Sequence, residues 1–123
     1  MIDPNFILLY VNNPHASAAF YADLLDNKPI ESSPTFAMFA LQSGVMLGLW
    51  AKHTVSPNAT ASAGAAELAF AVADNAAVDS MHADWLRRGL SIAQAPTDLD
   101  FGYTFVALDL DGHRLRVFAP SGS

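Results

Sequence analysis

The 123-residue sequence predicts an α+β fold, in which two tandem βαβββ modules form a cupped mixed sheet with the helices on its outer face. Two observations predict it: one order of apolar runs and helical stripes occurs twice, and the two copies keep a constant spacing. At this length we expect a single domain over residues 1–123. Its expected parts are module one over about 5–52, a linker over 53–65 and module two over about 66–120.

The first module begins with the apolar run 6–11, which is rich in β-forming residues and predicts a strand. Residues 12–14, Asn-Asn-Pro, supply a helix cap and a first-turn proline. Apolar residues then recur at intervals of four, which predicts a helix over 14–25. The expected buried stripe of this helix is Ala16, Phe20 and Leu24, with Tyr21 beside it. The strand-like runs that follow are 29–32, 36–41 and 45–51.

The second module repeats this plan, beginning with a strand at 68–72 and a candidate cap at Asp74. Arg87, Arg88 and Gly89 close the helix, because cations suit its last turn and glycine suits the position beyond. The expected stripe of this helix is Val78, Met81 and Trp85. The three strand-like runs that follow are 90–95, 103–109 and 113–119.

The two copies align by subtraction. Val11 and Val72 differ by 61, and several later pairs share this offset. The turns 43–45 and 111–113 are equivalent at an offset of 68. One insertion of about seven residues therefore separates the second copy from the first.

Composition excludes several classes of function. Twelve acidic against six basic residues leave a net charge of −6, which is the wrong sign for holding nucleic acid. The absence of cysteine excludes disulfides, thiolate nucleophiles and cysteine-bound metal centres. No apolar run reaches the roughly 18 residues of a membrane span, so we expect no membrane partner. Residues 1–5 do not resemble a secretory signal, so we expect a cytoplasmic protein.

Two sequence motifs carry a family resemblance: residues 20–25, Phe-Tyr-Ala-Asp-Leu-Leu, and residues 109–115, Asp-Leu-Asp-Gly-His-Arg-Leu. Together with the duplicated module they make the chain resemble the vicinal oxygen chelate superfamily, which includes glyoxalase I, extradiol dioxygenases and bleomycin-resistance proteins. The resemblance implies a site inside the cup and a homodimer. A narrower resemblance, to metal-free phenazine-resistance members, is carried by 5–12, 46–50, 97–105 and 111–117.

The enzymes of that superfamily hold a metal at four positions, which correspond here to Phe6, Gly48, Glu67 and Arg116. Of these four residues, only Glu67 has a side chain that can bind a metal, and Arg116 carries a fixed positive charge that would repel one. The histidines offer no replacement, because they lie far apart in the sequence and form no short ligand pair. We therefore expect no metal and no cofactor. The histidines are His15, His53, His82 and His113.

Side chains alternate across a strand, so these four positions also predict which residues face the cup. The cup-facing positions of the first and last strands are Phe6, Leu8, Tyr10, Met46, Gly48, Trp50, Glu67, Ala69, Ala71, Arg114, Arg116 and Phe118. The opposite face is aliphatic and suited to packing under the helices. Small residues among the aromatic ones suggest unfilled volume, which is typical of a pocket for a flat organic molecule.

The expected binding residues combine this face with a rim loop over 98–103. Trp50 is the expected stacking wall, and Glu67 with Arg116 would orient the ligand. Two alternatives stay open: the aromatic side chains fill the space themselves, and Glu67 and Arg116 form an internal salt bridge. The expected ligand-binding residues are Phe6, Leu8, Tyr10, Met46, Gly48, Trp50, Glu67, Ala69, Asp98, Phe101, Tyr103, Arg116 and Phe118.

The leading hypothesis is a binding protein that sequesters a small planar aromatic compound such as an antibiotic. The alternative is a glyoxalase-like or dioxygenase-like enzyme, which the loss of three metal ligands disfavours. A metal-free enzyme would need a base such as Glu67, Asp98 or Asp100, but aspartates beside glycine are commonly turn residues. Enzyme activity is left open, and we expect no catalytic residue.

Overall fold

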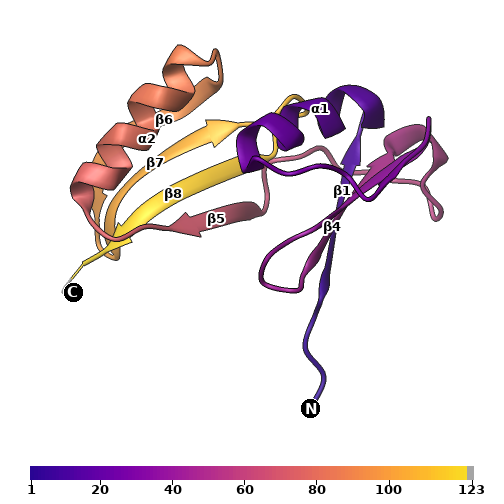
Figure 1. Cartoon of the computed structure of the whole chain (residues 1–123), viewed down its shortest axis with the longest axis horizontal. Helices are drawn as coiled ribbons and strands as arrows, with labels where there is room; N and C mark the ends of the chain where they lie inside the picture. The colour runs from indigo at the N-terminus through magenta and orange to yellow at the C-terminus, as the bar shows by residue number, and fades with distance from the viewer. Residues whose placement is uncertain (122–123) are drawn as a thin grey trace. The chain divides into compact units, whose positions relative to one another are not determined.

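The computed structural model describes residues 1–121 and divides the chain into two compact units. Unit 1 covers Met1–Ala61 and unit 2 covers Ser62–Ser123, so the boundary falls within the expected linker 53–65. In each unit one helix packs against a four-stranded sheet (Figure 1). No helix among residues 1–121 is long and apolar enough to cross a membrane.

Unit 1 has the sheet order β1-β4-β3-β2. Strands β1 and β4 are parallel, and the other neighbours are antiparallel. Helix α1 packs against β3 and β4. The elements are β1 (Phe6–Val11), α1 (Pro14–Leu25), β2 (Glu31–Ser32), β3 (Phe36–Ala40), β4 (Met46–Ala51) and the short 3-10 helix η1 (Lys52–Thr54).

Unit 2 has the equivalent order β5-β8-β7-β6, with β5 parallel to β8. Helix α2 packs against β6, β7 and β8. The elements are β5 (Glu67–Ala71), α2 (Asn75–Arg87), β6 (Ser91–Leu99), β7 (Gly102–Leu108) and β8 (Arg114–Pro120). Two βαβββ modules of α+β type are therefore confirmed.

The strand registers confirm the internal repeat. Phe6 lies opposite Met46 in unit 1, and Glu67 lies opposite Arg114 in unit 2. These partners are 40 and 47 residues apart, which reproduces the seven-residue insertion. Strand β6 has nine residues where β2 has two, so the insertion lengthens the hairpin of β6 and β7.

Helix α1 begins and ends where the sequence predicts, but its buried stripe differs. Asn13 caps the helix by accepting a hydrogen bond from the Ala16 amide at 3.2 Å, and Pro14 follows in the first turn. The expected stripe of Ala16, Phe20 and Leu24 is wrong, because these side chains are only partly buried. The helix is turned so that small residues approach the sheet closely and one large ring fills the centre. The buried residues are Pro14, Ser17, Ala18 and Tyr21.

Helix α2 follows the prediction more closely. Asp74 accepts a hydrogen bond from the Ala77 amide at 2.8 Å, which confirms it as the cap. Val78 and Trp85 are buried, and Met81 is partly buried. The Trp85 ring lies edge-on to two strand residues, Phe70 at 5.7 Å and Phe105 at 5.4 Å. This aromatic cluster forms the centre of the core in unit 2.

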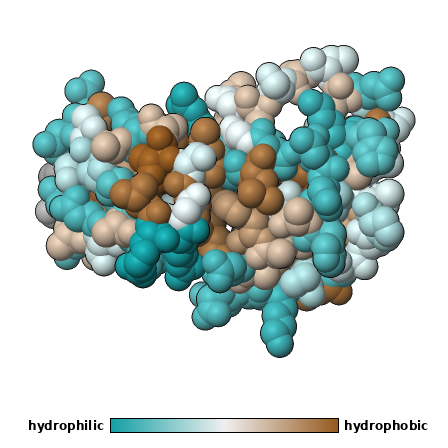
Figure 2. All heavy atoms as spheres, turned by 90° about the horizontal axis from the view of Figure 1, so that it is seen from above, coloured by the Kyte–Doolittle hydropathy of each residue, from teal (hydrophilic) through white to brown (hydrophobic). Residues whose placement is uncertain are grey.

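The expected alternation along the strands is confirmed. Leu47 and Leu49 on β4 and Leu115 and Val117 on β8 are fully buried beneath the helices. Ile7 is an exception on the helix-facing side, because it lies on the edge strand β1 and is 37% exposed. Hydrophobic side chains therefore also reach the surface (Figure 2).

Candidate ligand-binding site

The two units divide the expected binding residues into two sets. The set in unit 1 is Phe6, Leu8, Tyr10, Met46, Gly48 and Trp50. The set in unit 2 is Glu67, Ala69, Asp98, Phe101, Tyr103, Arg116 and Phe118. Paired strand residues share a sheet face, so the registers place the whole unit 1 set on one face.

The set in unit 2 is organised around a salt bridge between β5 and β8. Arg116 Nε donates to Glu67 Oε1 at 2.8 Å, and Arg116 Nη2 donates to Glu67 Oε2 at 2.9 Å. This two-pronged geometry is the strongest form of arginine–carboxylate pair. The Arg116 side chain is only 14% exposed. Glu67 and Arg116 therefore form the mutual pair that the sequence left open.

Three further side chains complete this arrangement. Arg116 Nη1 donates to Thr104 Oγ1 at 3.2 Å, and the same hydroxyl donates to the Val117 carbonyl at 2.8 Å. The Arg116 guanidinium lies over the Phe101 ring, 5.6 Å from its centroid. Phe101 in turn lies edge-on to Phe118, with ring centroids 5.8 Å apart. We call Glu67, Thr104, Phe101, Arg116 and Phe118 the Arg116 cluster.

Arg114 lies beside the cluster on the same face of β8. It pairs in register with Glu67, and its Nη1 lies 3.7 Å from Glu67 Oε2. The hydrogen bond from Arg116 lowers the pKa of Glu67 from its ordinary value of 4.5, and the charges of Arg116 and Arg114 lower it further, although burial opposes them. The carboxylate is therefore ionised at neutral pH.

A tight turn presents the Phe101 ring to the cluster. Leu99 pairs with Gly102, so only residues 100 and 101 lie between β6 and β7. The Ser121 amide donates to the Phe101 carbonyl at 2.9 Å and fixes the turn against β8. The rim loop expected over 98–103 is thus a two-residue turn, because the strands extend further than the sequence indicated.

Asp98 and Tyr103 lie on the other face of this hairpin. They pair with each other in register, and Tyr103 also pairs with the buried Ala119 rather than with Arg116 or Phe118. The Tyr103 hydroxyl donates to Asp79 Oδ1 on α2 at 2.7 Å. The structure therefore brings Phe101 to the Arg116 cluster and directs Asp98 and Tyr103 toward the helix side.

The set in unit 1 forms an apolar face. Tyr10 lies edge-on to Trp50 across β1 and β4, with ring centroids 6.1 Å apart. Gly48 was expected to leave unfilled volume, and this expectation is wrong. A Cβ atom on Gly48 would lie 2.7 Å from Leu8 Cδ2 and 2.9 Å from Phe36 Cζ, so these two side chains already cover the glycine.

The repeat relates the two sets to each other. Subtracting 61 from Glu67 gives Phe6, and subtracting 68 from Arg116 gives Gly48. The same offset of 68 relates Thr104 to Phe36. Each polar member of the Arg116 cluster therefore has an apolar or small counterpart in unit 1, and only unit 2 has charged groups at these positions.

The residues at the family's metal positions do not fit a metal ion. Glu67 has both carboxylate oxygens bonded to Arg116, and the guanidinium would repel a cation. Phe6 and Gly48 have no ligand atom in their side chains. Among residues 1–121 there is no group of three or more His, Asp or Glu side chains placed to hold a metal.

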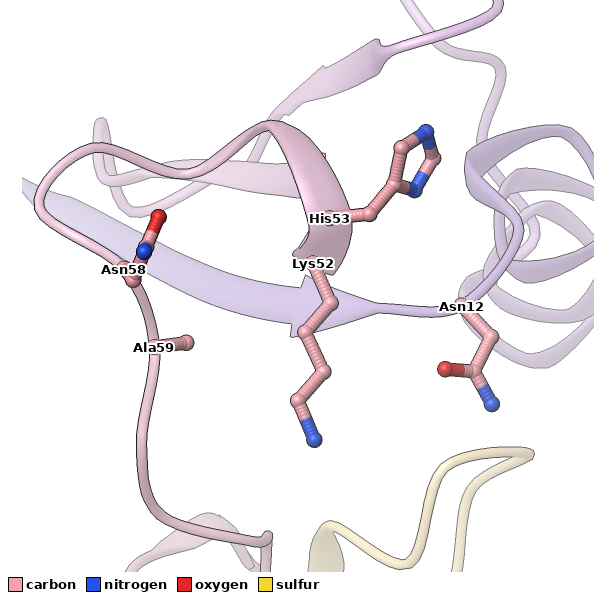
Figure 3. A pocket seen from close by; sticks show the side chains of 5 residues that line it. All are labelled: Asn12, Lys52, His53, Asn58 and Ala59. Carbon is pink, nitrogen blue, oxygen red and sulfur yellow. The ribbon is translucent and has the colours of Figure 1, made fainter.

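Unit 1 also contains a polar hollow of about 490 Å³ near the end of β4. The side chains of Lys52 and Asn12 extend to the same side of it, and the His53 ring points away from them (Figure 3). No Phe, Tyr or Trp is among its lining residues, so it does not suit a flat apolar ligand. The lining residues are Asn12, Lys52, His53, Asn58 and Ala59.

Thr104 and Phe36 are absent from the sequence-based set of binding residues. Both lie on strands whose alternation was not extended to the site, although Thr104 pairs with Phe118 and Phe36 pairs with Trp50. Applying the same alternation to these antiparallel neighbours would have found both. Arg114 was placed on the correct face but was not chosen as a binding residue.

Comparison with known proteins identifies the family. The family model "Glyoxalase/Bleomycin resistance protein/Dioxygenase superfamily" matches residues 4–117. The phenazine antibiotic resistance protein EhpR of Enterobacter agglomerans is 28% identical over 122 residues, covering 94% of this chain and 91% of that protein.

Solved structures share the fold. Protein ATC0852 from Agrobacterium tumefaciens is 51% identical, with a TM-score of 0.91 over 99% of this chain and 100% of that one. A glyoxalase-related enzyme from Fulvimarina pelagi is 19% identical, with a TM-score of 0.83 over 97% of this chain and 88% of that one. The duplicated modules, the conserved architecture and the family match lead to one conclusion: the chain belongs to the glyoxalase/bleomycin resistance protein/dioxygenase superfamily.

Proposed function

We propose that this protein binds and sequesters a small planar aromatic compound, of the kind represented by phenazine antibiotics, without a metal ion. A resistance-type or glyoxalase-type role is supported by the family and by the similarity to EhpR. The observation that carries the finer proposal is the cation–π contact between the Arg116 guanidinium and the Phe101 ring, beside Phe118. It combines aromatic surface with a fixed polar pair in one place.

The Arg116 cluster suits a flat ring system for physical reasons. Phe101 is 45% exposed, so it offers an aromatic surface to a ligand. Aromatic rings prefer offset or edge-on contact with other rings. Phe101 and Phe118 already lie edge-on to each other, so a flat ligand could contact both rings. The Glu67–Arg116 pair would then orient polar substituents of the ligand.

Binding without chemistry is favoured over catalysis by the state of Glu67. A general base works best when its pKa lies near the working pH. The pKa of Glu67 is instead held below its ordinary value by Arg116, which makes the carboxylate a weak base. We further propose a homodimer in the cytoplasm, and we propose that Trp50, on the apolar face of unit 1, is itself a stacking surface.

Isothermal titration of the purified protein with phenazine tests the proposal. We expect saturable binding, and we expect Phe101→Ala to weaken it about tenfold because the stacking surface is lost. Leu110→Ala is the matched control, since Leu110 is an exposed apolar residue near another turn of unit 2. No binding to the native protein, or equal losses in both variants, would refute the proposal.

Quenching of tryptophan fluorescence tests the proposed role of Trp50. The chain has two tryptophans, and Trp85 is buried in the core beneath α2. We expect phenazine to quench the native protein and to leave Trp50→Phe almost unquenched. Quenching that persists in this variant would mean that Trp50 is not a stacking surface.

A further inference from the structure

We propose that Arg114, rather than Arg116, recognises an anionic group on the ligand, so that the preferred ligand is a planar aromatic acid. This inference rests on the proposed function and names the ligand class of the same site. It corrects the simplest interpretation of the sequence, in which Arg116 orients the ligand directly.

Arg116 is already committed to groups of the protein. Its Nε and Nη2 bind both oxygens of Glu67, and its Nη1 binds the Thr104 hydroxyl. The guanidinium also lies over the Phe101 ring, 5.6 Å from its centroid. These bonds use three of the five N–H groups of Arg116, and the Glu67 carboxylate already neutralises its charge, so a ligand carboxylate would have to compete with Glu67 for it. Arg116 is therefore a positioning residue.

Arg114 is differently placed. Its side chain is 47% exposed, and its contact with Glu67 at 3.7 Å is longer than a hydrogen bond. Two arginines face one carboxylate here, which gives the group a net charge of +1. Because Arg116 neutralises Glu67 at short range, the unbalanced positive charge lies at Arg114.

The order of residues along β8 matches an aromatic acid. Arg114, Arg116 and Phe118 alternate onto one face, as their partners Glu67, Ala69 and Ala71 show. From Arg114 to Phe118 the strand rises about 13 Å, at about 3.3 Å per residue. A fused ring system resting on Phe101 and Phe118 could therefore direct a carboxylate substituent toward Arg114.

The charge of the whole chain makes this local charge selective. A net charge of −6 repels anions in general, so an acid would be favoured only where a cation is presented beside a suitable surface. Arg87 and Arg88 also share one carboxylate, Asp84. The Arg87 side chain lies in the last turn of α2 and is 73% exposed, so Arg87 provides a control for charge alone.

The test compares two probes that differ in charge, phenazine-1-carboxylate and phenazine-1-carboxamide, by isothermal titration at neutral pH. We expect the native protein to bind the acid about tenfold more tightly than the amide. Arg114→Gln should remove this preference by weakening the acid alone. Arg87→Gln should leave both affinities unchanged, because it removes equal charge elsewhere.

Arg116→Gln supplies the second measurement. A positioning residue should affect both probes alike, because its loss disturbs both Glu67 and the Phe101 ring. Selective loss of acid binding in Arg116→Gln, or an intact preference in Arg114→Gln, would overturn the inference. Tight amide binding without preference for the acid would overturn this inference alone. Failure of both probes and of phenazine to bind the native protein would overturn the proposed function as well.

Discussion

Gly48 stands where two neighbouring side chains leave no room for a larger residue. In Gly48→Ala the new Cβ would meet Leu8 and Phe36 at less than 3 Å, so both side chains would have to move. Both contact atoms are the free ends of side chains, which can move aside, so we expect a loss of about 1 kcal/mol in the free energy of unfolding, at the low end of the cost of overpacking. Urea denaturation of the variant and the native protein measures this loss.

A second substitution checks the physical reason. Leu8 is 45% exposed, so shortening it to alanine should cost little by itself while opening space above residue 48. The double variant Gly48→Ala/Leu8→Ala should therefore recover part of the lost stability. Additive losses would show that Leu8 is not the obstacle.

The Glu67–Arg116 pair should make stability depend on pH. The pKa of Glu67 is lowered by folding, so the pair stabilises the native state above pH 4.5 and loses this effect as the pH falls through the lowered pKa. We expect Glu67→Gln to be less stable than the native protein at pH 7 and closer to it at pH 3. Denaturant titration at both pH values measures the difference. A constant difference would contradict this assignment.

Single residues also show where sequence reasoning reaches its limit. Alternation placed Glu67, Arg116 and Gly48 on the correct faces, because it depends only on strand geometry. It did not show that Arg116 binds Glu67 in two-pronged fashion or that Leu8 covers Gly48. Those facts depend on side-chain rotamers and on neighbours from other strands.

The two helices present a prediction at the level of the element. Both residues belong to α1: the Tyr21 side chain is fully buried against the sheet, whereas that of its neighbour Phe20 is only partly buried. We expect Tyr21→Ala to cost about 3–5 kcal/mol of unfolding free energy and Phe20→Ala much less. Thermal unfolding of both variants compares them directly. A greater loss in Phe20→Ala would favour the stripe expected from the sequence.

A hydrogen bond ties α2 to the hairpin of β6 and β7. Asp79 accepts from the Tyr103 hydroxyl and raises the pKa of Tyr103 above 10.0, with Asp98 contributing. The neutral phenol is therefore favoured in the fold, and its stabilising effect is lost as the pH rises above 10. We expect Asp79→Asn to lower this pKa in an absorbance titration, with Tyr103→Phe identifying the signal. An unchanged titration would contradict the bond.

The ends of helices were predicted correctly where a capping residue or a proline marks them. Asn13, Asp74 and Pro14 fixed the starts of the helices, since caps and first-turn prolines act locally. The face of α1 was missed because Ala16, Phe20 and Leu24 give an equally regular stripe. The choice between the two stripes depends on how closely small residues let the helix approach β3 and β4.

For the molecule as a whole, we expect no tightly held metal. At the family's metal positions the positive charge of Arg116 repels a cation, and its two hydrogen bonds to Glu67 occupy both carboxylate oxygens. Elemental analysis of protein dialysed after exposure to Zn²⁺ and Ni²⁺ should find far less than one ion per chain. A stoichiometric ion that survives dialysis would refute the interpretation of these positions.

The repeat was the most predictable feature of the whole chain. Equal spacing in the sequence became equal strand register in the two units, because duplicated segments fold by the same local rules. The single-domain organisation and the division at about 5–52, 53–65 and 66–120 stay predictions. The exact location of the seven extra residues needed the structure, since the offsets confine them only to the segment between the end of the second helix and the turn 111–113.

Those seven residues break the symmetry of the duplication. They lengthen the hairpin that carries Phe101, and unit 1, with its two-residue β2, has no equivalent arm. The counterparts of Glu67 and Arg116 in unit 1 are Phe6 and Gly48, so a second copy of the cluster cannot form there. Of the two duplicated units, only unit 2 therefore has the charged groups that would bind an acid. The expected stoichiometry is one aromatic acid per chain rather than two.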